Sequence, residues 1–102
     1  MIILGPSLVR DIHCYFDTNE NDQLICTWTE PEYKNGPVQL YSAHLMANER
    51  TIHMVETKDN QFKWKHPFEY DEIYSLNVKA KTTKWGESSS TTFTREKPSE
   101  LC

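Results

Sequence analysis

The residues most able to do chemistry in this chain are the cysteines Cys14 and Cys26. They flank a polar stretch, residues 17–23 with the sequence DTNENDQ, which predicts a hairpin turn. A hairpin centred near Glu20 sets Cys14 opposite Cys26, which brings their Cβ atoms within reach of a disulfide. Two buried thiols are the alternative. The disulfide would contribute about 3 kcal/mol and would place the protein in an oxidising, extracellular compartment.

Other metal-binding or redox chemistry has little support. Cys102 is left to pair outside this chain or to remain a free thiol, and the sequence has no C-x-x-C motif. A turn centred on residues 48–49 would set His44 opposite His53 on an outward face. Two histidines make an incomplete zinc site, so we expect neither a metal nor a cofactor.

Catalytic groups of residues have equally little support in the sequence. Glu69, Asp71 and Glu72 resemble a general acid/base group, but no companion nucleophile or glycine-rich loop accompanies them. The serines at 88–90 lie outside any G-x-S-x-G motif. We therefore expect a solvated acidic corner and no enzyme activity.

The composition restricts the class of protein. The chain has 102 residues and a net charge of −4, which removes the phosphate attraction on which most nucleic-acid binders rely. No apolar run approaches the ~20 residues of a membrane helix, so no membrane insertion is expected in this fragment. Hydrophobic residues are only 37% but aromatic residues reach 12%, which indicates a small core built from large rings.

Alternating apolar and polar residues predict strands along the whole chain. The clearest case places Tyr74, Leu76, Val78 and Ala80 on one face. Seven such segments are predicted, at 8–16, 23–29, 38–46, 51–56, 61–65, 72–82 and 88–94. This pattern predicts an all-β, seven-stranded immunoglobulin-like sandwich over residues 7–95. Residues 1–6 are expected to be a leader or linker, and residues 96–102 a tail or linker, in a piece of a longer protein.

Several landmarks along the chain resemble those of a fibronectin type III domain. They are Trp28 and Pro31 on and after the second strand, Tyr41 on the third, Phe68 where Leu is usual, and Tyr74. The resemblance implies that Trp28 and Tyr41 lie between the sheets and that Tyr74 forms a tyrosine corner. Its hydroxyl is then expected to bond backbone near residues 68–70.

Two further features resemble the class I cytokine-receptor homology module. One is the block Cys14 to Cys26-Thr27-Trp28, whose family counterpart has a disulfide joining the first two strands. The other is Trp85-Gly86-Glu87-Ser88-Ser89, which keeps the first Trp and the final Ser of a WSXWS box. In such modules the box Trp stacks between cations, a role that Lys79 and Lys81 would take here. The second disulfide common in such modules is absent.

Two loops, residues 30–37 and 82–87, are expected to emerge at the same end of the sandwich. Each carries an aromatic residue beside charges, the pattern of an interface anchor with a polar rim. The predicted partner-binding residues are Glu32, Tyr33, Lys34, Lys84 and Trp85. Tyr33 is either a contact residue or a ring lying on its own surface, and Trp85 is either an anchor or the stacked structural residue.

Two functions are compatible with these features. The first is a module in the ectodomain of a single-pass, cytokine-receptor-like membrane protein, which binds a helical cytokine or a co-receptor chain beside neighbouring domains of its own chain. The second is a spacer or adhesion domain of a cell-surface or matrix protein. The ligand and the signalling pathway are not indicated by the sequence.

Overall fold

The computed structural model describes residues 5–17, 23–33, 36–65 and 68–95. The strands are β1 (Arg10–Asp17), β2 (Gln23–Thr29), β3 (Leu40–Ala47), β4 (Arg50–Thr57), β5 (Gln61–Lys65), β6 (Ile73–Lys81) and β7 (Ser89–Thr94). All seven predicted strands are present, and none of their ends differs from prediction by more than two residues. The described residues contain no helix long and apolar enough to cross a membrane.

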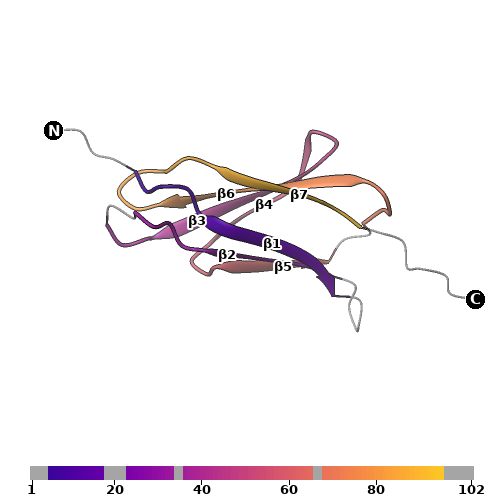
Figure 1. Cartoon of the computed structure of the whole chain (residues 1–102), viewed down its shortest axis with the longest axis horizontal. Coiled ribbons are helices and arrows are strands. Elements are labelled where there is room, and N and C mark those ends of the chain that lie inside the picture. The colour runs from indigo at the N-terminus through magenta and orange to yellow at the C-terminus, as the bar shows by residue number, and fades with distance from the viewer. Residues whose placement is uncertain (1–4, 18–22, 34–35, 66–67, 96–102) are drawn as a thin grey trace, which may run out of the picture.

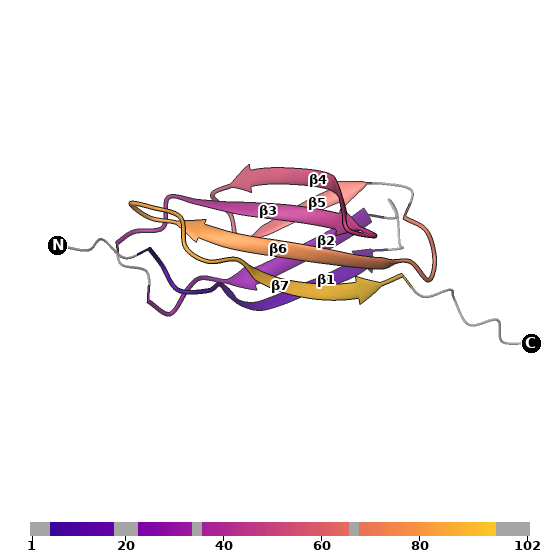
Figure 2. The same ribbon diagram turned by 90° about the horizontal axis from the view of Figure 1, so that it is seen from above.

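The strands form two antiparallel sheets that face each other (Figures 1 and 2). One sheet has the order β1-β2-β5, and the other has the order β4-β3-β6-β7. In a constant-type immunoglobulin domain the fourth strand joins the sheet of the first two, whereas here β4 pairs with β3. The seven strands in two facing sheets confirm the predicted seven-stranded sandwich.

Aromatic rings fill the space between the sheets. Trp28 on β2 meets Tyr41 on β3, with ring centroids 5.5 Å apart and an edge-on geometry. Phe62 on β5 packs beside Trp28 at 6.4 Å. Leu24, Leu45, Leu76 and Val78 are completely buried in the same core cluster as these rings. Trp28, Tyr41 and Phe62 thus supply the large apolar areas that a sequence with few hydrophobic residues needs.

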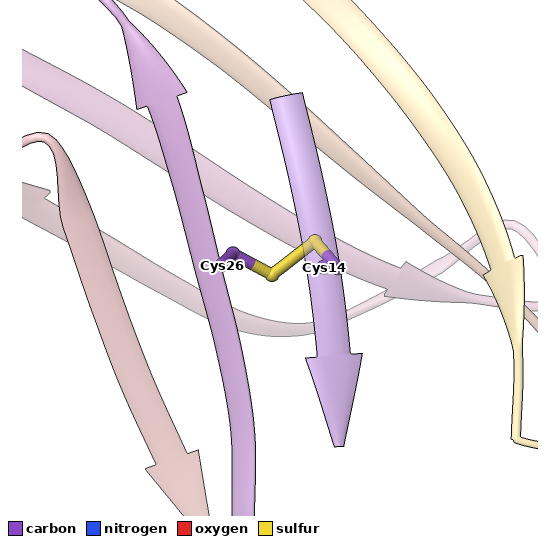
Figure 3. Close-up of a disulfide and its surroundings, with 2 residues drawn as sticks. All are labelled: Cys14 and Cys26. Carbon is purple, nitrogen blue, oxygen red and sulfur yellow. A yellow bond between two sulfur atoms is a disulfide. The ribbon is translucent and has the colours of Figure 1, made fainter. Parts of the chain in front are cut away.

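The β1–β2 hairpin holds the cysteine pair that its turn predicts. Cys14 and Cys26 are direct cross-strand partners and form a disulfide, with their Cα atoms 4.1 Å apart (Figure 3). The disulfide prediction is confirmed, and the alternative of two buried thiols is wrong. The predicted turn centre at Glu20 lies outside the described residues, but the neighbouring pair Phe16–Leu24 has the expected register.

The β3–β4 hairpin departs from the predicted pairing of histidines. Asn48 and Glu49 have positive φ angles of 49° and 66°, as a two-residue type I′ turn requires. A bulge next to this turn then adds one residue to β4, so His44 faces Met54 instead of His53. His53 instead stacks on Trp64 of the other sheet, with centroids 4.2 Å apart. The predicted opposition of His44 and His53 is wrong.

Candidate partner-binding end

Three segments meet at one end of the sandwich, at the left of Figures 1 and 2. They are residues 5–9 before β1, the β2–β3 loop and the β6–β7 loop. A cavity of about 490 Å³ lies between them, lined by residues 5–8, Tyr33 and residues 84–87. The two loops that the sequence places at a common end therefore share one surface.

Tyr33 is the most exposed large hydrophobic residue at this end, with 67% of its surface accessible. Its backbone is nevertheless held on both sides by Ser7. The Ser7 amide donates to the Tyr33 carbonyl at 2.8 Å, and the Tyr33 amide donates to Ser7 Oγ at 3.1 Å. Pro31, two residues earlier, is fully buried and anchors the loop to the core. A fixed backbone thus presents a solvent-exposed ring, and a partner binding there has little loop to order.

Two glycines allow the segment before β1 to approach the β6–β7 loop. A Cβ on Gly86 would lie 2.4 Å from the Pro6 carbonyl oxygen, and a Cβ on Gly5 would lie 2.7 Å from that of Trp85. The Gly86 amide also donates to the Ala80 carbonyl at 2.8 Å, which ties the loop to β6. Gly5 and Pro6, which the sequence assigns to a leader or linker, therefore pack against the β6–β7 loop.

Trp85 does not project from this end as an exposed anchor. It is half-buried and forms an isolated bridge with Lys81. Lys79 Nζ lies 4.9 Å and Lys81 Nζ 5.6 Å from the indole centroid. This is the stacked arrangement that the cytokine-receptor resemblance implies. The turn at Gly86 instead leaves the indole packed against the two lysines of β6.

The other predicted site residues lie on the two loops or on β7. Glu32 and Lys84 are exposed on the two loops, whereas Lys34 lies outside the described residues. Ser89 begins β7 and pairs with Val78. The sequence provided no reason to select Leu8, which is 43% exposed beside the cavity. Neither did it indicate the Ser7 clamp on Tyr33, since a contact across 26 residues leaves no local pattern.

The corner opposite this end contains the predicted tyrosine corner. The Glu69 amide donates to the Tyr74 hydroxyl at 2.8 Å, inside the predicted range of residues 68–70. The hydroxyl donates in turn to Glu72 Oε2 at 3.3 Å. Burial is the largest influence and raises the pKa of Tyr74, and the negative charge of Glu72 raises it further. The hydroxyl of Tyr74 therefore stays protonated, and able to donate to Glu72, to a higher pH than in a free tyrosine.

Replacing Tyr74 with phenylalanine is expected to lower the free energy of unfolding by about 1–3 kcal/mol, because the Glu69 amide loses its acceptor. Because folding raises the pKa of Tyr74, its protonated hydroxyl contributes stability that is fully present below pH ~10, the ordinary pKa of tyrosine. This contribution is lost as the pH rises through the raised pKa of the folded protein. Denaturant melts of both proteins at pH 7 measure the difference. A Tyr74→Phe protein as stable as wild type would show that this hydrogen bond is worth nothing.

His44 and the acidic corner make structural hydrogen bonds in the described residues. Within the described ranges, no three His, Cys, Asp or Glu side chains gather to hold a metal ion. His44 instead makes a hydrogen bond with the Thr51 hydroxyl. In the acidic corner, Glu72 accepts from the Asn48 side-chain amide at 2.7 Å as well as from Tyr74, which is a structural arrangement.

Comparison with known proteins adds evidence on the fold. No protein-family model and no curated protein matches the sequence. Among solved structures, domains d3-d4 of the rat CD45 extracellular region superpose with a TM-score of 0.76 at 14% identity, covering 90% of this chain and 51% of that one. Domains A168-A170 of titin give a TM-score of 0.66 at 19% identity, covering 91% of this chain and 33% of that one.

At these identities the similarity extends to the fold alone, and this chain spans only about half and a third of the two structures. Together with the placement of β4 beside β3, it defines the architecture as a fibronectin type III-like β-sandwich. This confirms the predicted fold class.

Proposed function

We propose that this chain is an extracellular fibronectin type III module of a cytokine-receptor-like cell-surface protein. It binds a protein partner, a helical cytokine or a co-receptor chain, through the end that carries Tyr33. The observation that carries the proposal is Tyr33 itself, a ring 67% exposed on a backbone clamped by Ser7. A large ring that is both exposed and rigidly presented matches the anchors that dominate protein interfaces.

The extracellular location is supported by the Cys14–Cys26 disulfide, because such bonds persist in oxidising compartments. The similarity in fold to the CD45 extracellular region is consistent with it. The cytokine-receptor class is supported by two local features. They are the disulfide that joins β1 to β2 and the Trp85 ring beneath Lys79 and Lys81.

The two aromatic residues have different roles in this proposal. Tyr33 is free to contact a partner, whereas Trp85 is already covered by two lysines and fixes the β6–β7 loop. Leu8, beside the same cavity, adds apolar area next to Tyr33. Glu32 and Lys84 form the charged rim, which is expected to influence the association rate more than the affinity.

The test is a binding screen of the whole chain against a panel of four-helix cytokines and receptor ectodomains, measured by biolayer interferometry. Tyr33→Ala is expected to weaken the interaction found by about 1–3 kcal/mol, which is the range of an interface hot spot. The matched control is Tyr15→Ala on the outer face of β1, where the ring is 45% exposed. The control is expected to leave affinity unchanged.

Trp85→Ala separates the anchor role from the stacking role. If the stack is structural, this variant has a lower melting temperature, and its binding at the Tyr33 end changes less than in Tyr33→Ala. Equal loss of binding in Tyr33→Ala and Tyr15→Ala would contradict the proposed surface. No binding to any member of the panel would favour the spacer or adhesion domain instead.

A further inference from the structure

The two sheets leave four edge strands, and three of them carry features that oppose pairing with another chain. β1 is interrupted by a bulge between Arg10 and His13 and contains Asp11 at a positive φ of 53°. β4 has its own bulge and carries the charges of Arg50 and Glu56. β5 has only five residues. Short strands, bulges and charged residues are the usual protection of an exposed edge.

β7 has none of these features. Its six residues, Ser-Ser-Thr-Thr-Phe-Thr, include no charge and no proline, and its register with β6 is unbroken from Ser89 to Thr94. Threonine and phenylalanine also favour strands. A quarter of all residues in this chain are charged, so an uncharged edge strand stands apart from the rest of the surface.

The open edge of β7 is accessible to a further strand. β1 lies in the other sheet and meets β7 through side chains, as in the contact of Phe16 with Phe93 at 5.9 Å. Among the described residues, 89–94 make no backbone hydrogen bond outside the strand pairing with β6. Alternate N–H and C=O groups of β7 therefore point away from the sheet without a backbone partner.

We propose that β7 is a homodimerisation edge, at which two copies of this chain pair antiparallel and join their four-stranded sheets into one eight-stranded sheet. A two-fold axis at Thr92 sets residue 92 opposite itself and residue 90 opposite residue 94. On the outer face the pairs are then Thr with Thr and Ser with Thr, and on the inner face Thr91 meets Phe93. Hydroxyl pairs and aromatic pairs with β-branched residues are both favourable across strands.

The self-complementary pairing of the uncharged β7 side chains, and not the net charge, supports a second copy as the occupant. Each copy has a net charge of −4, so two copies repel each other over most of their surfaces. The pairing brings together only uncharged side chains of β7, next to Ser75 and Asn77 on the outer face of β6. This interface is distinct from the Tyr33 end, so the dimerisation proposal and the proposed function can be tested independently.

The test is sedimentation equilibrium of the full chain at about 10 µM to 1 mM, a range that detects weak association. A Cys102→Ser background excludes intermolecular disulfides. The mass is expected to rise from 12.0 kDa toward twice that value. Thr92→Lys and Thr92→Glu each place like charges directly opposite each other and are expected to weaken self-association at least ~5-fold. An equimolar mixture of the two is expected to associate again, within about twofold of wild type.

The matched control is Met54→Lys, which introduces the same charge at a residue 61% exposed on β4, the other edge of the same sheet. It is expected to dimerise as wild type does, and thermal melts establish that all variants are folded. A wild-type chain that stays monomeric throughout this range overturns the proposal. So does a Lys and Glu mixture that fails to associate, or a Met54→Lys variant that loses the dimer.

Discussion

Removing the disulfide by the double change Cys14→Ala and Cys26→Ala is expected to lower the free energy of unfolding by about 3 kcal/mol. The bond closes a loop with a sequence separation of 12 between its ends, and most of its effect comes from restricting the unfolded chain. In the folded protein it also fastens β1, an edge strand whose ladder with β2 is interrupted by a bulge. Guanidinium melts of both proteins measure the loss.

The control for this change is Cys102→Ala, which removes a thiol without breaking the Cys14–Cys26 bond and is expected to leave stability unchanged. Hydrogen exchange gives a second measurement. Amides of β1 are expected to exchange faster than those of β3 and β6 in the double variant, because β1 loses its covalent attachment to the sheet. A loss of less than about 1 kcal/mol, with β1 still protected, would show that pairing alone holds this strand.

Most of the fold could be predicted because each strand carries its own signal. Tyr74, Leu76 and Val78 alternate with polar residues, and the observed burial of β6 follows that alternation. The polar stretch after β1 set the hairpin register closely enough to pair Cys14 with Cys26. Both signals are local, since side chains two residues apart in a strand share a face.

The errors arose where one residue or one distant contact decides the structure. A bulge adds a residue to β4 and moves His53 from an expected surface pair to a stack on Trp64. No residue pattern near position 52 predicts this bulge. The Ser7 clamp that fixes the Tyr33 backbone joins segments 26 residues apart and depends on the finished fold. The sequence thus indicated both aromatic residues of this end and the lysines beside Trp85, but not the Ser7 contacts that fix the Tyr33 backbone.

The second large effect on stability is expected at Phe68, the residue that directly precedes the acidic corner. Phe68 is 4% exposed and meets Phe16, Trp64 and Tyr74 edge-on, at centroid distances of 5.2, 5.8 and 5.1 Å. Its carbonyl also accepts a hydrogen bond from Arg95 Nη1 at 3.0 Å. Rings from β1, β5 and β6 therefore meet on one side chain, and that side chain closes this end of the core.

Phe68→Ala is accordingly expected to destabilise the protein by about 3–5 kcal/mol, since it leaves a cavity that three rings from different strands cannot fill. Phe68→Leu, which restores the residue usual at this position in the family it resembles, is expected to cost only about 1–2 kcal/mol, the loss of edge-on ring contacts with most of the volume retained. Ile73→Ala is the control, because Ile73 is close in sequence but 61% exposed, and its removal should change stability by less than about 0.5 kcal/mol. Denaturant melts with equal m-values rank the three variants, and equal losses for alanine and leucine would show that ring geometry, and not volume, holds this end of the sandwich together.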